Sequence, residues 1–258
     1  MVLNNLVATA ALRHGSWLRD WAPMLVDELY QKFVALGESG LMPGDLLTLA
    51  AAIKEYQPGV ILELGRGFGT STALFRLLEI PVISVCRETL WQDRTLAALA
   101  FVRPIDWERG VNAIVGEIAE QDYPRLLADA VRPMIFWDAH GYDVAEIVFN
   151  RIIPALSGRA ALVACHDLRD SRFFDADDRP PQQAPLWRGN SVDRFLRLGD
   201  IHSGFEQLVS IVDFVSWKGL AIHSPTHEIM TSREALALLP SVTGWPYCLW
   251  HYFFVPAD

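Results

Sequence analysis

Short apolar runs alternate with segments of helical spacing through the middle of the chain. Five of the runs are expected to be strands, at 60–64, 82–85, 111–115, 134–137 and 160–165. Helical spacing of apolar residues falls between them, near 71–78, 90–101, 124–130 and 144–156. Because the strands are apolar at nearly every position, the pattern predicts an α/β fold. We expect a Rossmann-like, doubly wound and mostly parallel sheet, covered by helices on both faces.

The two ends of the chain extend this pattern. Helical spacing over 17–56 predicts two or three helices before the first strand. A stretch rich in charge and proline, 167–190, is expected to be a long loop, either a lid over the site or a disordered insertion. Three further candidate strands, at 207–214, 217–223 and 248–255, could extend the sheet and include an antiparallel member; the whole sheet is expected to have seven strands.

The whole of 1–258 is therefore expected to be one domain. It would comprise an N-terminal helical segment (1–56), a ligand-binding core (57–168), the loop (169–190) and a C-terminal part that completes the sheet (191–258).

Composition narrows the range of partners. The net charge is −9 and no basic stripe is interleaved with aromatic residues, which argues against a nucleic-acid substrate and favours a small molecule. Three cysteines, Cys86, Cys165 and Cys248, show neither close pairing nor metal-ligand spacing, as expected for core residues in a reducing compartment. No run of about 18 apolar residues and no basic leader is present, so we expect a cytoplasmic protein without a membrane partner.

A glycine-rich turn directly follows the first predicted strand, in the run 60–72, VILELGRGFGTST. Glycines at 65, 67 and 69 let the backbone turn sharply and approach a ligand closely. A Walker-type phosphate loop would need a lysine that is missing here, and a pyrophosphate would be repelled by the carboxylate of Glu63. The turn therefore favours a ligand with a positive group. A helix is expected to begin at Thr70, Ser71 or Thr72, any of which could cap it.

With these residues the chain resembles the class I S-adenosylmethionine-dependent methyltransferases. Their first motif has the form E/D-x-G-x-G-x-G, which is complete here between Glu63 and Gly69. An ordinary glycine-rich turn remains the alternative. The resemblance implies that S-adenosylmethionine is the cofactor and that it is bound by Glu63, Gly65, Gly67, Gly69 and Ser71.

Two later strand ends correspond less closely to this family. The family usually has an acid for the ribose hydroxyls after the second strand, where this chain has Cys86; Glu88, two residues on, is either the replacement or a solvated surface charge. After the third strand, Gly116 and Glu117 are similar to the segment that contacts adenine in the family, or form a simple strand-terminal turn.

The fourth and fifth strand ends resemble one branch of the family. Asp138, with His140 behind it, and His166-Asp167 are similar to segments of metal-assisted O-methyltransferases and of the cephalosporin hydroxylase and macrocin methyltransferase group. The resemblance implies metal ligands at Asp138 and Asp167, with His166 as the third and Mg²⁺ or another divalent cation bound. Without a metal, His166 or His140 could act as a general base, or each could be a structural histidine, and Asp138 would contact the cofactor or its acceptor.

The expected function is S-adenosylmethionine-dependent methylation of a small molecule, and the methylated atom is expected to be oxygen. Two alternatives stay open, namely a cephalosporin hydroxylase-like enzyme on the same fold and a non-catalytic binding protein with a degenerate site, which Cys86 supports. The apolar N-terminal segment or the aromatic residues at 250–254 could form a homodimer interface, or belong to the core.

Overall fold

A computed structural model of the chain describes residues 5–22, 28–31, 41, 43–87, 89, 109–139, 142–166 and 251–255. The helices are α1 (Asn5–Ala22), α3 (Pro43–Tyr56), α4 (Thr70–Leu77), α6 (Tyr123–Leu126), α7 (Tyr142–Ile147) and α8 (Ile153–Ala155), with a 3₁₀ turn η3 (Ile118–Glu120) and a π-helical turn η4 (Val148–Ile152). The strands are β1 (Val60–Leu64), β2 (Val82–Cys86), β3 (Val111–Val115), β4 (Pro133–Trp137), β5 (Ala161–Cys165) and β6 (His251–Val255).

The strands form one sheet in the order β3-β2-β1-β4-β5-β6. Strands β1 to β5 are parallel, and β6 pairs antiparallel with β5. This is the usual strand order of a doubly wound fold, in which the chain changes direction across the sheet between β1 and β4. The structure thus confirms the predicted α/β, Rossmann-like and mostly parallel sheet.

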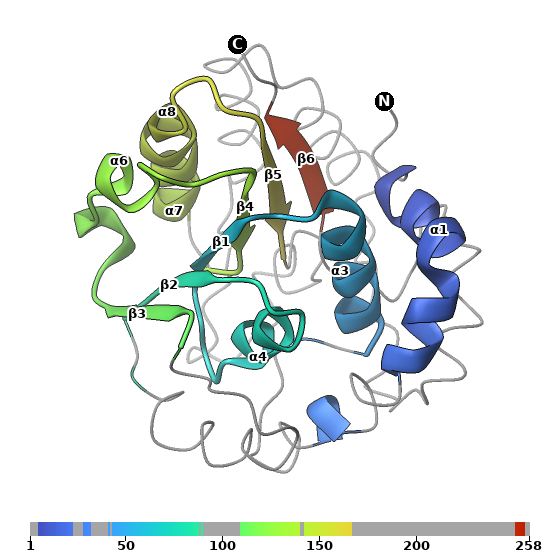
Figure 1. Cartoon of the computed structure of the whole chain (residues 1–258). Helices are drawn as coiled ribbons and strands as arrows, with labels where there is room; N and C mark the ends of the chain where they lie inside the picture. Colours follow the sequence, from blue (N-terminus) through green and yellow to red (C-terminus); the bar gives the residue numbers. More distant parts are fainter. Residues whose placement is uncertain are drawn as a thin grey trace, which may run out of the picture.

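Helices cover both faces of the sheet (Figure 1). One face, including Ile61 and Phe136, packs in the same core as α1, α3 and α4. The other face, including Leu62 and Trp137, packs in the core that contains η4 and α8. Since neighbouring residues of a strand point to opposite faces, burial on both sides explains why nearly every strand position is apolar.

The predicted elements within the described residues are largely confirmed. The five central strands lie within one residue of the predicted bounds, and β6 supplies the expected antiparallel member. The helix predicted at 144–156 is interrupted by the π-helical turn, and the one predicted at 124–130 is only the short α6. The helix at 90–101, the loop 167–190 and the strands at 207–214 and 217–223 lie outside the described residues, and the division into one domain stays a prediction.

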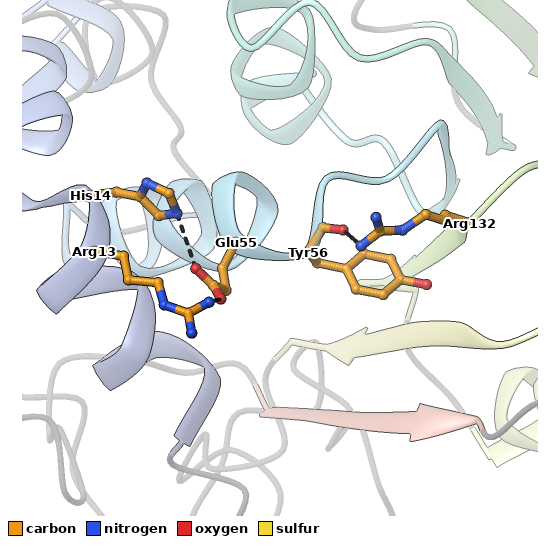
Figure 2. A network of polar contacts seen from close by, with 5 residues as sticks. All are labelled: Arg13, His14, Glu55, Tyr56 and Arg132. Carbon is orange, nitrogen blue, oxygen red and sulfur yellow. Dashed lines mark hydrogen bonds and ion pairs between the residues drawn. The ribbon is translucent and has the colours of Figure 1, made fainter.

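Polar contacts join the N-terminal helices to each other and to the sheet (Figure 2). Near the end of α3, Glu55 accepts a hydrogen bond of 2.5 Å from Arg13 and lies 3.0 Å from Nε2 of His14, both on α1. The next residue, Tyr56, donates its hydroxyl to the carbonyl of Pro133 at 3.2 Å, while Arg132 donates to the Tyr56 carbonyl. These contacts fix α1 and the end of α3 beside the start of β4. None of the helices described combines the length and apolarity that crossing a bilayer requires.

Candidate functional site

Four of the predicted site residues lie at the same edge of the sheet. Backbone hydrogen bonds between neighbouring strands continue for one residue past the strand ends. The amides of Gly65, Asp138 and His166 donate to the carbonyls of Val85, Leu64 and Trp137, respectively, each at 2.9 Å. The amide of Gly116 donates to the carbonyl of Cys86 at 3.1 Å. The carboxyl ends of parallel strands share one edge, which is where doubly wound folds bind ligands. Gly65 and Asp138 follow β1 and β4, the two strands between which the chain changes direction.

The glycine turn after β1 has two differently constrained positions. Gly65 has φ +88°, and a Cβ there would lie 2.7 Å from the backbone nitrogen of Ala139, so the turn packs tightly against the end of β4. Gly67 has φ +52°, and a Cβ there would meet nothing within 4 Å. A side chain at 65 would therefore clash with the protein itself, whereas position 67 is open to a ligand.

The helix α4 begins at Thr70, as predicted, but without the expected hydroxyl cap. The residue before the helix is Gly69, in the left-handed conformation at φ 88°, and no side chain caps it. The predicted hydroxyl cap is wrong because the hydroxyl groups of Ser71 and Thr72 are used elsewhere: both donate to Glu63 beneath the turn.

Glu63 is fully buried and its carboxylate accepts three hydroxyl hydrogen bonds. Ser71 donates to Oε1 at 2.5 Å, Thr72 donates to Oε2 at 2.6 Å, and Ser84 also donates to Oε2. Burial raises the pKa of Glu63 above its ordinary value, while the three hydroxyls, and to a lesser degree Arg66, oppose that rise. Through these hydrogen bonds Glu63, on β1, holds the start of α4 and the middle of β2 together. It therefore stabilises the glycine turn that connects β1 to α4.

Arg66 belongs to the same buried group. Only 2% of this residue is exposed, and its Nη1 donates to the carbonyl of Ser84 at 3.1 Å. Burial lowers the pKa of Arg66, against the opposing effect of Cys86 and Glu63. Cys86 itself is buried at the end of β2, the position where the resemblance implies a ribose-binding acid.

Asp138 and His166 are in direct contact at the edge of the sheet. Nδ1 of His166 and Oδ1 of Asp138 are hydrogen-bonded at 2.8 Å. The side chain of Asp138 is 22% exposed and that of His166 is 1% exposed. On the far side of the ring, Nε2 of His166 lies 3.6 Å from Oδ2 of Asp45, whose side chain has no exposed surface. The histidine therefore lies between two carboxylates, behind Asp138 as seen from solvent.

The metal prediction concerned Asp138, His166 and Asp167. Within the described part of the chain, no group of three or more His, Cys, Asp and Glu side chains could hold a metal ion. Nδ1 of His166 is hydrogen-bonded to Asp138, and a ligand role for His166 stays a prediction. Asp167 lies outside the described residues, so ligation by the two aspartates stays a prediction.

The remaining predicted contacts are placed only in part. Glu117 is exposed after β3, with Oε1 3.6 Å from Nε of Arg87. Gly116 precedes it at the sheet edge. Glu88 and His140 lie outside the described residues, and their predicted roles, like those of Gly116 and Glu117, stay predictions.

Sequence reasoning missed several residues that organise this site. Ser84 pairs in register with Glu63, and a hydroxyl residue in the middle of an otherwise apolar strand was a usable signal. Asp45 gave none, since an acid in the first turn of a helix is ordinary. Only the folded arrangement brings Asp45 to His166, 121 positions later in the sequence.

No protein-family model matches the chain, and no curated protein sequence matches it. Solved structures do resemble it. TomG from Streptomyces achromogenes, an O-methyltransferase of tomaymycin synthesis solved with S-adenosylmethionine, is 21% identical with a TM-score of 0.48, over 70% of this chain and 78% of its own. The methyltransferase PaMTH1 from Podospora anserina, solved with S-adenosylhomocysteine, is 16% identical with a TM-score of 0.41, over 81% of this chain and 85% of its own. With TM-scores below 0.5, these likenesses carry no argument about this chain, and the case for its function rests on the residues at its own strand ends.

Proposed function

We propose that the protein is an S-adenosylmethionine-dependent methyltransferase that acts on a small molecule, at oxygen. One observation carries this proposal. The glycine turn between β1 and α4 lies where the chain changes direction across the sheet, and it packs directly against the segment that follows β4, which begins with Asp138. In doubly wound folds this is the place where a nucleotide-type ligand binds.

The residues present suit the charges of this cofactor. Its methionine part carries a carboxylate, an ammonium and a sulfonium group. The backbone amides at the start of α4, which no side chain caps, suit the carboxylate, and the partly exposed carboxylate of Asp138 suits the cationic groups. Open space at Gly67 lets the backbone approach the ligand closely. When bound, the cofactor supplies a methyl group that is already activated for transfer.

Glu63 and Ser71 would then act on the cofactor through the turn. The side chain of Glu63 is sealed by three hydroxyls, and the hydroxyl of Ser71 is one of these donors. The backbone amide of Ser71, rather than its side chain, is then the group that faces the cofactor. Glu63 stabilises the turn that holds the cofactor instead of contacting it.

Proton transfer from the acceptor is best assigned to Asp138. Its side chain is 22% exposed, against 1% for His166, so Asp138 is the group that an acceptor can reach. The hydrogen bond from His166 fixes the direction of the Asp138 carboxylate. Holding the acceptor hydroxyl beside the methyl group and accepting its proton are the two tasks left to the protein.

A second candidate function is a binding protein without catalysis. It is favoured by Cys86, which stands where the resemblance implies an acid for the ribose hydroxyls. A thiol is a weak hydrogen-bond acceptor, so cofactor affinity would be lower with Cys86 than with a carboxylate, unless Glu88 takes this role.

The proposal is tested by titration calorimetry with S-adenosylhomocysteine, in EDTA and again with Mg²⁺ or Mn²⁺. Binding in EDTA supports the cofactor site, and a metal signal that is lost in Asp138→Ala supports metal assistance. Methyl transfer from labelled S-adenosylmethionine to a hydroxylated acceptor separates the methyltransferase from a hydroxylase-like enzyme and from the binding protein. No binding at millimolar S-adenosylhomocysteine would overturn the proposal.

A further inference from the structure

Asp45 is a fully buried carboxylate on a helix that none of the predicted site residues belongs to. It lies in the first turn of α3, and neither the residue nor its side chain has exposed surface. Removing a carboxylate from water is costly unless a positive or hydrogen-bonding group compensates for it. The imidazole of His166, 3.6 Å from Oδ2, is one ionisable partner of Asp45 within the part of the chain that the structure describes.

The three side chains form a continuous line from α3 to the edge of the sheet. Asp45 comes from α3, His166 follows β5 and Asp138 follows β4. Exposure falls along this line, from 22% for Asp138 to 1% for His166 and none for Asp45. Only Asp138 can meet a ligand, so the other two residues can influence a ligand only through it.

The backbone limits how the line can move. The amide of His166 donates to the carbonyl of Trp137 at 2.9 Å, which fixes His166 directly beside Asp138. The ring of Phe136 lies 6.5 Å from the imidazole, centroid to centroid, on the face of the sheet that packs with α3. Besides these two constraints, the ring has the carboxylate of Asp138 beside Nδ1 and that of Asp45 beside Nε2.

We propose that Asp45 and His166 are positioning residues for Asp138. Asp45 orients the imidazole, and the imidazole holds Oδ1 of Asp138, whose side chain is the partly exposed one of the three. This makes α3 part of the support of the ligand site, although Asp45 itself is fully buried. The inference rests on the proposed function for the identity of the ligand, but the link between the three residues does not depend on it.

The chain offers a matched control on the same helix. Glu55, near the other end of α3, is also an acid within 3.0 Å of a histidine nitrogen, that of His14 (Figure 2). Glu55→Gln therefore makes the same chemical change as Asp45→Asn, in a similar type of pair, away from the sheet edge. Asp45→Glu keeps the charge and serves as the conservative variant.

The first measurement is a double-mutant cycle on the whole chain. The free energy of unfolding in urea is measured for Asp45→Asn, Asp138→Asn and the double variant. The three variants are made once in the natural sequence and once in a chain that also carries His166→Gln. Because His166 lies between Asp45 and Asp138, we expect the changes in unfolding free energy of the two substitutions to be non-additive when His166 is present. We expect these changes to be additive in the His166→Gln background. Additive effects in both backgrounds would overturn the inference, whatever the protein binds.

The second measurement is affinity for S-adenosylhomocysteine. We expect Asp45→Asn to weaken it by about fivefold or more, Glu55→Gln to change it less than twofold, and Asp45→Glu to recover most of it. Equal affinity in Asp45→Asn and the natural protein would overturn the positioning role. If Asp45→Asn does not fold, His166→Gln breaks the same link and takes its place. If the natural protein does not bind S-adenosylhomocysteine, the proposed function fails, and the double-mutant cycle alone decides the link.

Discussion

Replacing Glu63 by glutamine should preserve the fold and change how stability depends on pH. Glutamine has the shape of the glutamate and can still bond to the hydroxyls that surround it, because hydroxyl groups both donate and accept. Its amide oxygen can replace Oε1 as the acceptor for Ser71. Its amide nitrogen can donate to Thr72 and Ser84, whose hydroxyls then rotate.

The direction of the pH effect follows from burial. The pKa of Glu63 is raised in the folded protein, mainly by desolvation. Between the unfolded pKa, 4.5, and the higher folded pKa, the unfolded chain has lost this proton and the folded chain still holds it. The folded state therefore loses stability as the pH rises through this window, by at most about 1.4 kcal/mol per pH unit for one proton. Glu63→Gln removes this dependence.

The magnitudes separate glutamine from alanine. At pH 7 we expect Glu63→Gln to stay within about 1 kcal/mol of the natural protein, because the relief of a buried charge offsets the weaker hydrogen bonds and the lost attraction to Arg66. Glu63→Ala leaves three buried hydroxyls without their acceptor and opens a cavity, at a cost of about 3 kcal/mol or more.

The assay is urea unfolding followed by far-UV circular dichroism at pH steps from 4 to 8, together with S-adenosylhomocysteine affinity at pH 7. Ser84→Ala is the control, since it removes one hydroxyl donor and keeps the charge. If Glu63→Gln lost as much stability as Glu63→Ala at pH 7, the charge itself would be needed and our reasoning would be refuted. If it bound S-adenosylhomocysteine more than about tenfold more weakly while remaining folded, a loss of 1.4 kcal/mol, Glu63 would contact the ligand directly.

Other substitutions test the turn and the packing around it. Gly65→Ala should destabilise the protein by about 3 kcal/mol in urea unfolding, because its Cβ would lie 2.7 Å from the Ala139 backbone nitrogen at a positive φ. Gly67→Ala should cost only about 1 kcal/mol in the same assay, because its Cβ would meet nothing within 4 Å, but it should weaken S-adenosylhomocysteine binding. Arg159→Ala should cost about 2 kcal/mol in urea unfolding, because Arg159 donates to the carbonyls of Leu127, Ala130 and Leu156. Tyr123→Phe should lower stability by about 1 kcal/mol in the same assay, because it removes a 2.6 Å hydrogen bond to the Ile118 carbonyl.

The sheet was predictable because burial acts on each strand separately. Apart from Glu63, the residues of β1 and β4 are apolar on both faces, and this pattern does not depend on which elements pack against them. The glycine turn was equally local, since Gly65 and Gly69 need positive φ and glycine adopts it without strain. Helix details were less predictable: the cap expected from Ser71 or Thr72 failed because Glu63, one strand away, competes for both hydroxyls.

The chemistry of the site was only half predictable, because it depends on pairs that are distant in sequence. Asp138 and His166 were found from their positions after strands, but not the bond between them, 28 residues apart. In the proposed function, that bond makes His166 a support for Asp138 in place of the base or metal ligand expected from the sequence. Asp45 could not be found at all, since nothing in its neighbourhood distinguishes a buried acid from an exposed acid in a first helical turn.

Three acids lie at or beneath the site, and their surroundings give them different tasks. Glu63 is surrounded by neutral hydroxyls, which stabilise the turn without supplying a full opposite charge. Asp45 lies beside the imidazole of His166, and the orientation of that ring in turn affects the position of Asp138 in our proposal. Asp138 keeps one oxygen on that imidazole and has 22% of its side chain exposed. Since Glu63 and Asp45 are fully buried, Asp138 is the acid of the three that a cationic ligand can reach. We therefore expect substitutions of Glu63 or Asp45 to change ligand affinity while Asp138 remains the acid that faces the ligand.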